Sequence, residues 1–171
     1  MILYHGSNIM IQNIDLNKCR PYKDFGKGFY CTTIRSQAEL MAKRVAAIYG
    51  GTPTVTELSM SDDISKDENL IIKEYEMPSK EWALFVLNNR NRSFDEFHSK
   101  DSNYDCKYDM VVGPVADDAL ALLFRSFSNG LIDIDILVKD MKFKKFTNQY
   151  SFHTVNAIKY LKVIGGSNYG D

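Results

Sequence analysis

Two short glycine-containing motifs near the N-terminus constrain the fold of this chain more than any other feature of its sequence. The first motif, His-Gly-Ser at residues 5–7, follows an apolar stretch that begins at Ile2. The second motif, at residues 24–30, brackets a lysine with two glycines and ends in Phe-Tyr. Each motif predicts a short strand with a polar, glycine-containing turn, and the two strands are expected at residues 1–6 and 27–33.

The composition predicts one globular domain over residues 1–171. Of these residues 44% are hydrophobic and 25% are charged, so the chain can bury a sizeable core. A net charge of -1 argues against an overall basic surface for nucleic acid or an anionic membrane. The three cysteines show no Cys-x-x-Cys spacing, and no signal peptide or membrane span is visible. A cytoplasmic location is therefore expected.

The order of periodic segments predicts the α+β class. Helices are expected at residues 37–49, from residue 79, at 117–129, at 133–141 and from residue 155. Further strands are expected at residues 54–60 and 108–113. In the first helix Ser36 is the expected cap, and Leu40 and Met41 are among the apolar residues at helical spacing. Polar stretches at residues 61–69 and 88–105 are expected to be loops, and the second of them to be the most mobile part of the chain.

A strand predicted at residues 145–152 has two different faces. Successive side chains of a strand point to opposite sides. One predicted face is aromatic, and the other is small and polar. The aromatic face holds Phe146, Tyr150 and Phe152, and the polar face holds Thr147, Gln149 and Ser151. Such a strand can hold a core on one side and line a cleft on the other.

Two segments near the N-terminus could bind a ligand, although each has a structural alternative. His5 is either a structural histidine at a strand end or part of a recognition turn with Gly6 and Ser7. Residues 26–28 (Gly-Lys-Gly) form either a simple turn or a loop that binds phosphate through its backbone amides. The positive charges of residues 20, 23 and 27 suit a pyrophosphate, but a solvated charge cluster is the default explanation.

Other catalytic patterns are absent from the sequence. It contains neither the His-Glu-x-x-His motif of zinc proteases nor the Gly-x-Ser-x-Gly motif of α/β-hydrolases. Asp117-Asp118 is best explained as the N-terminal cap of a helix. No set of side chains has the spacing of metal ligands, so no metal is expected.

The motifs at residues 3–7 and 25–30 together resemble the ADP-ribosyltransferase superfamily, in the branch of diphtheria toxin and poly-ADP-ribose polymerases with its His-Tyr-Glu triad. Within that branch, residues 24–30, 108–118 and 149–154 resemble most closely an uncharacterised family of short bacterial single-domain proteins. The resemblance implies an ADP-ribosyltransferase-like fold, in which split antiparallel β-sheets and surrounding helices enclose a cleft for NAD.

The resemblance also implies a role for individual residues. His5, Tyr30 and Gln149 would form the catalytic triad, and His5 would also bind a ribose hydroxyl of the adenosine half of NAD. The backbone of Gly6 would hold the nicotinamide carboxamide, and Tyr30 would stack on the nicotinamide ring. The remaining residues expected to bind NAD are Ser7, Arg20, Lys27, Gly28 and Met41.

This sequence departs from the family pattern at two of these positions. Gln149 stands in Asn-Gln-Tyr where the family has Asn-Glu-Tyr. A glutamine keeps a hydrogen bond to the ribose but lacks the carboxylate that stabilises positive charge when the bond to nicotinamide breaks. Met41, with Leu40 beside it, stands where the family often has a second aromatic residue, and a methionine can still cover a ring face.

The resemblance implies a mono-ADP-ribosyltransferase that uses NAD as co-substrate, releases nicotinamide and transfers ADP-ribose to an acceptor. The acceptor could be a protein, a nucleic acid or a small molecule. Bacterial relatives suggest a toxin or effector with a neutralising antitoxin-like partner. The alternatives are a module that binds NAD or ADP-ribose without catalysis, and an interaction protein whose similarity to the family is incidental.

Overall fold

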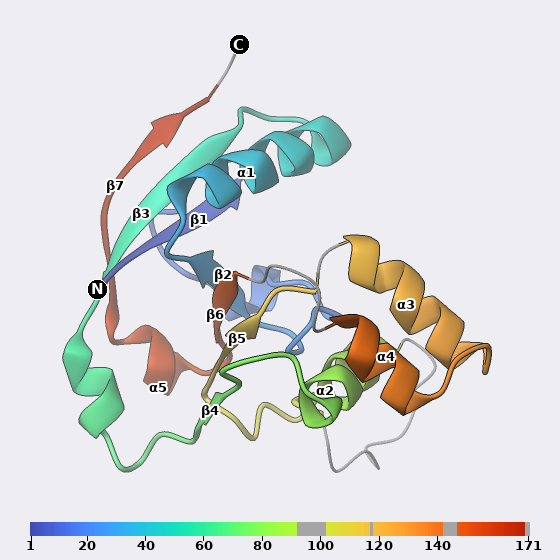
Figure 1. The fold of residues 1–171 in the computed structure, drawn as a ribbon. Helices are drawn as coiled ribbons and strands as arrows, with labels where there is room; N and C mark the ends of the chain where they lie inside the picture. The colour runs from blue at the N-terminus through green and yellow to red at the C-terminus, as the bar shows by residue number, and fades with distance from the viewer. Residues whose placement is uncertain (92–101, 117, 142–146, 170–171) are drawn as a thin grey trace.

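The computed structural model describes residues 1–91, 102–116, 118–141 and 147–169, and it confirms the α+β class. Seven strands form one mixed sheet in the order β4-β5-β6-β2-β1-β3-β7 (Figure 1). The strands are β1 (Ile2–Ser7), β2 (Phe29–Thr32), β3 (Thr54–Met60), β4 (Ile72–Glu74), β5 (Met110–Pro114), β6 (Asn148–Phe152) and β7 (Leu161–Asn168).

Five α-helices and two short 3-10 helices accompany the sheet in the described residues. The α-helices are α1 (Arg35–Tyr49), α2 (Lys80–Arg90), α3 (Asp118–Ser128), α4 (Ile134–Met141) and α5 (Val155–Ile158). The 3-10 helices are η1 (Leu16–Lys18) and η2 (Asp62–Lys66). Within the described residues, no helix has both the length and the apolar character that crossing a bilayer requires.

Adjacent strands pair antiparallel, with one exception. β4 and β5 run parallel, with Ile72 opposite Met110, so the expectation of purely antiparallel sheets is wrong at this edge. Parallel strands need a crossover connection, and α2 lies in the chain between β4 and β5. β4 and β7 were not expected as strands, because β4 has only three residues and β7 contains two glycines.

The pairing between β1 and β2 is the shortest in the sheet. The register between these two strands consists of the single pair Tyr4 and Thr32, whereas β1 and β3 share six pairs. Figure 1 shows α1 beside the half formed by β1, β3 and β7, and it shows α2, α3 and α4 grouped beside β4 and β5. The two motifs of the sequence therefore lie on either side of this short pairing, one on β1 and one at the start of β2.

Helix α1 packs on the sheet through alanines rather than through its larger apolar residues. Ala38, Ala42 and Ala46 are buried, whereas Leu40 is 69% exposed. The reason is the closeness of Gly6 on β1, because a Cβ atom there would lie 2.0 Å from the carbonyl oxygen of Ala38. Only small residues on both elements allow this approach.

The predicted helix caps and helix ends are confirmed in part. The expected cap Ser36 is wrong, because α1 begins two residues earlier than expected, at Arg35, with Ile34 at the cap position. Ser79 does cap α2, and it accepts a hydrogen bond of 3.1 Å from the backbone of Trp82. Gly130, with a φ of 71°, follows the end of α3 as predicted. The cap expected at residue 117 lies outside the described residues.

Two polar stretches that were expected as loops differ in structure. Residues 61–69 contain η2, and Asp67 fixes them to the C-terminal part of the chain. The hydroxyl of Tyr160 donates a hydrogen bond of 2.7 Å to Asp67, and the ammonium of Lys159 lies 3.2 Å away. Hydrogen bonds from Tyr160, then from Asn69 and from Lys159, hold the pKa of Asp67 well below its usual range. In the second stretch α2 continues to Arg90, while the mobility expected around residues 92–101 falls outside the described residues.

Candidate functional site

The candidate site begins with the pairing of β2 and β6. Tyr30 lies opposite Ser151 and Thr32 lies opposite Gln149, so these four side chains share one face. The other face of β6 carries Phe152, which is fully buried in an apolar cluster. The predicted alternation is therefore confirmed for residues 148–152, which form β6, while Phe146 lies outside the described residues.

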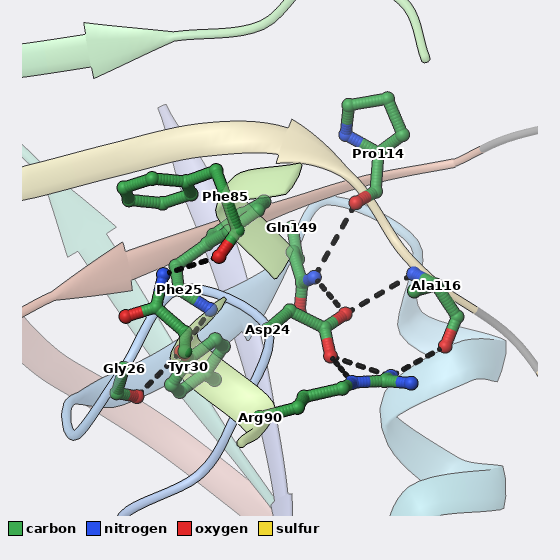
Figure 2. Close-up of polar contacts among 10 residues, drawn as sticks. Asp24, Phe25, Gly26, Tyr30, Phe85, Arg90, Pro114, Ala116 and Gln149 are labelled. Carbon is green, nitrogen blue, oxygen red and sulfur yellow. Dashed lines mark hydrogen bonds and ion pairs between the residues drawn. The ribbon is translucent and has the colours of Figure 1, made fainter. Parts of the chain in front are cut away.

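Gln149 is held by a buried carboxylate that the sequence did not single out. The amide nitrogen of Gln149 donates a hydrogen bond of 2.7 Å to Oδ2 of Asp24 and lies 3.4 Å from the carbonyl oxygen of Pro114 (Figure 2). Asp24 is only 7% exposed, whereas Gln149 is half-buried. Both neighbours of the amide nitrogen are hydrogen-bond acceptors, and this fixes which end of the amide faces them.

Arg90 compensates the charge of Asp24. Its Nε donates to Oδ1 of Asp24 at 2.8 Å, and its Nη2 lies 2.6 Å from the same oxygen. Nη2 also donates to the carbonyl of Ala116, whose backbone N–H donates to Oδ2 of Asp24 at 3.1 Å. Asp24 thus accepts hydrogen bonds at both oxygens, from α2, from the strand end after β5 and from β6 (Figure 2). Partners of this kind offset the hydration that a carboxylate loses on burial.

The phenol of Tyr30 is fixed by the turn that precedes β2. Its hydroxyl donates to the carbonyl of Gly26 at 2.7 Å and accepts a bond of 3.0 Å from the backbone of Phe25. Burial, and next the nearby charge of Asp24, raise the pKa of Tyr30 well above its usual value. The phenol is therefore protonated at neutral pH, and its ring is the part that remains for contact with a ligand.

His5 is attached to the same strand but faces the other way. Its Nδ1 lies 2.7 Å from the carbonyl oxygen of Tyr30, and its ring stacks on Phe29 at 4.3 Å between centroids. Phe29 belongs to the apolar cluster of Leu3 and Phe152, whereas Tyr30 packs against the cluster of Phe25. Burial lowers the pKa of His5, so the ring is neutral at pH 7 with the proton on Nδ1.

The structure therefore brings two of the three expected triad side chains together. Tyr30 and Gln149 share one face and are joined through the segment at Asp24. The imidazole of His5 lies toward the opposite cluster and is connected to them through the backbone of Tyr30. Nε2 of His5 has no hydrogen-bond partner among the described residues, so it can accept one from a ligand.

Two of the three glycines in the motifs, Gly6 and Gly28, have structural roles. Gly6 allows α1 to approach β1, as described above. A Cβ atom at Gly28 would lie 2.6 Å from Nδ1 of His153 and 2.8 Å from the carbonyl of Phe152. His153 is 4% exposed, and its Nδ1 donates to the carbonyl of Lys27 at 2.8 Å. Burial lowers its pKa to about 4, so this histidine holds the turn as a neutral group.

The other expected NAD-binding residues are dispersed around this region. Lys27 is exposed, Met41 is 47% exposed on α1, and Ser7 lies near Asn8 at the end of β1. The guanidinium of Arg20 stacks 3.6 Å from the ring centre of Tyr49. Tyr49 ends α1, about 18 Å along the helix from Gln37 in its first turn. Arg20 is therefore engaged at the C-terminal end of α1, whereas Gln37 in the first turn bonds the residue that precedes β6.

A polar side chain of α1 that reaches β6 was also missed by the sequence analysis. Gln37 donates to the hydroxyl of Thr147 at 2.5 Å, and its carbonyl oxygen accepts a bond of 2.9 Å from Thr32. This chain of bonds joins the first turn of α1 to β2 and to the start of β6. The helical pattern of α1 gave no signal for it, because a lone glutamine on a helix is ordinary.

The described residues also line a hollow that is separate from Tyr30 and Gln149. It has a volume of about 500 Å³ and lies between the segment at Gln12 and Ile14 and the start of β7 at Lys162. Among the described residues, no group of three histidine, cysteine or carboxylate side chains could hold a metal ion.

The family model described as a protein of unknown function, DUF3990, matches residues 1–163. The chain therefore belongs to this family, and the match includes β1, β2 and β6. No curated protein matches the chain. No solved structure matches it either.

Proposed function

We propose that this chain is a mono-ADP-ribosyltransferase that binds NAD at the face shared by β2 and β6. The observation that carries the proposal is the register that places Gln149 opposite Thr32 and Tyr30 opposite Ser151. This register puts the two motifs from residues 24–30 and 148–150 side by side, as the resemblance requires, although about 120 residues separate them in the chain. A split ADP-ribosyltransferase fold, with its cleft where β1 and β2 meet, is part of the same proposal.

In this proposal the ring of Tyr30 stacks on nicotinamide, and Gln149 accepts a hydrogen bond from a hydroxyl of the adjoining ribose. Positive charge on that sugar builds up as the bond to nicotinamide breaks. The half-buried state of both side chains leaves part of each open to a ligand. His5 faces the opposite cluster, so it would contact NAD only where the adenosine half extends past β2 toward β1. There its neutral imidazole would accept a hydrogen bond at Nε2 from the adenosine ribose.

The test uses NAD labelled in its adenosine half, with and without cell lysate as a source of acceptors. The proposal predicts release of nicotinamide and transfer of label, both reduced at least tenfold in Gln149→Ala. Gln12→Ala, which truncates an exposed glutamine of the loop after β1, is the matched control and should behave as the wild type. If the wild type releases no nicotinamide and transfers no label, the enzymatic proposal is wrong.

A second candidate, a module that binds NAD or ADP-ribose without catalysis, is favoured by one observation. The carboxylate that contacts Gln149 belongs to Asp24, and it is already neutralised by Arg90. The contacts of Gln149 therefore offer no unpaired negative charge to a developing cation. Calorimetry that detects NAD binding, together with an absence of nicotinamide release, would decide for this candidate.

His5→Ala separates the two interpretations of this histidine. If His5 binds the ribose, the variant should bind NAD at least tenfold more weakly than the wild type when both are fully folded. If His5 is only structural, the variant should lose stability while the folded protein binds NAD with unchanged affinity. Both quantities come from one titration of thermal unfolding with NAD.

A further inference from the structure

The strongest unexplained feature of the site is the environment of the Gln149 amide. Its nitrogen faces two acceptors, Oδ2 of Asp24 at 2.7 Å and the carbonyl oxygen of Pro114 at 3.4 Å. An amide nitrogen has two hydrogens to donate, whereas a carboxylate has none. This end of residue 149 is therefore built for a donor, and an ionised glutamate would place a third acceptor against the other two.

Asp24 cannot turn away from Gln149 without losing its other bonds. Its Oδ1 is held by Nε and Nη2 of Arg90, and its Oδ2 is held by the backbone N–H of Ala116. These donors come from α2 and from the strand end after β5, so rigid elements fix the carboxylate. Among the described residues, Oε1 of Gln149 has no donor, and it is the atom left for a ligand.

From these contacts we infer that Asp24 is a positioning residue of the proposed NAD site. Its carboxylate orients Gln149 so that Nε2 points inward and Oε1 is presented to the ribose hydroxyl. The negative charge of the site thus resides at position 24, paired with Arg90, and this pairing is the physical reason that residue 149 is a glutamine. The inference rests on the proposed function for the identity of the ligand, but the contact between Asp24 and Gln149 can be tested without NAD.

The first test is a thermal-unfolding cycle without NAD, comparing wild type, Gln149→Glu, Asp24→Asn and the double variant. Each single variant changes the charge of the cluster by one unit, whereas the double variant restores it. At pH 7 each single variant should lower the Tm by about 5 °C. The double variant should lose clearly less than the sum of the two, because the new carboxamide at position 24 can donate to the new carboxylate at position 149.

The second test is the pH dependence of the same losses. In Gln149→Glu the pKa of the introduced carboxyl group is raised in the folded state, because Asp24 lies beside it. At pH values between the pKa of this carboxyl group in the unfolded state and its higher pKa in the folded state, the folded protein holds the proton and the unfolded protein does not. The stability of the variant therefore falls as pH rises through this window. The Tm deficit of Gln149→Glu should therefore shrink as pH is lowered from 7 toward 4. Gln12→Glu, an exposed control with the same change of charge, should show no such trend.

The third test asks whether the positioning matters for the ligand. Nicotinamide release by Gln149→Glu should increase with pH, with an apparent pKa at least one unit above that of the double variant Asp24→Asn with Gln149→Glu. A merely structural role of Asp24 would lower the folded fraction but would not move this apparent pKa. The same profile in both variants would overturn the positioning role.

The outcomes separate the two proposals. If the Tm losses of the two single variants simply add, or if the loss in Gln149→Glu is independent of pH, then Asp24 does not hold Gln149 and the inference is wrong. If the cycle shows coupling but the wild type neither gains stability with NAD nor releases nicotinamide, the contact stands and the assignment of NAD fails. Coupling together with an NAD response in the wild type supports both.

Discussion

Two polar clusters join β6 to the segment at residues 24–28, and they differ in charge and in exposure. The ionic cluster consists of Asp24, Arg90 and Gln149, and Gln149 itself is half-buried. The neutral cluster consists of Ser151 and His153, which are almost fully buried, and it ends on the carbonyl of residue 27. The neutral cluster explains how the turn is held, whereas the ionic cluster has an acceptor atom to offer a ligand.

Neighbouring residues on one face of a strand can therefore have different roles. Ser151 lies 3.0 Å from the carbonyl of Val111 and 2.8 Å from Nε2 of His153. Its hydroxyl is fully buried by these partners, so the pair is not a nucleophile and base for an external substrate. Gln149, two residues earlier, keeps its Oε1 unbonded within the described part of the chain.

The largest expected effect concerns the protonation of His153. Its pKa is lowered to about 4, so the unfolded state takes up a proton first as pH falls. Stability present above pH 6.5 should be lost between pH 6.5 and 4, by up to about 3 kcal/mol. Urea unfolding of wild type and His153→Asn over this range measures the difference. Equal pH dependence of the two proteins would contradict the account of the neutral cluster.

Next in size is the effect of a methyl group at Gly28. Gly28→Ala should lower the free energy of unfolding by about 2–3 kcal/mol, because the new Cβ meets both His153 and the backbone of β6. Gly165→Ala is the matched control, since no atom lies within 4 Å of a Cβ there. Similar losses in the two variants, measured by chemical unfolding at pH 7, would show that the neutral cluster does not constrain the turn.

A smaller effect is expected when the ionic cluster is truncated. Gln149→Ala should lower the free energy of unfolding by less than about 1 kcal/mol, since Asp24 keeps its bonds to Arg90 and Ala116. Ser151→Ala should cost about 1–2 kcal/mol, because it removes the hydroxyl that donates to a buried acceptor. Chemical unfolding of the two variants gives the comparison directly. If Gln149→Ala lowers the free energy of unfolding as much as Ser151→Ala, both clusters have the same structural role. The ionic cluster is then not supported as a ligand site.

Much of the fold could be predicted because local patterns agree with it. The strand at residues 54–60, the helix capped by Ser79 and the two faces of β6 follow from alternation, caps and glycine stops. The buried face of α1 could not be predicted in this way. Its alanines are buried because Gly6, more than thirty residues earlier, brings β1 against the helix, and periodicity alone favours the larger Leu40 and Met41.

The proximity of Tyr30 and Gln149 was expected from the resemblance rather than from local patterns. Tyr30 and Gln149 do lie together, but Asp24 and Arg90 were not expected between them. These two residues are 66 positions apart, and a single sequence contains no signal that an aspartate and an arginine so far apart will pair. The direction of the His5 ring could not be predicted either. It depends on how β1 and β2 separate after their single register pair.

The most direct test of the account is the change in Tm that NAD produces. A ligand that binds only the native state at 100 times its Kd adds about 2.7 kcal/mol, which corresponds to roughly 5–10 °C for a chain of this size. We expect such a rise for the wild type at millimolar NAD, and a clearly smaller rise for Gln149→Ala at equal folded fraction. No rise in the wild type, or equal rises in both proteins, would contradict the claim that Gln149 faces NAD.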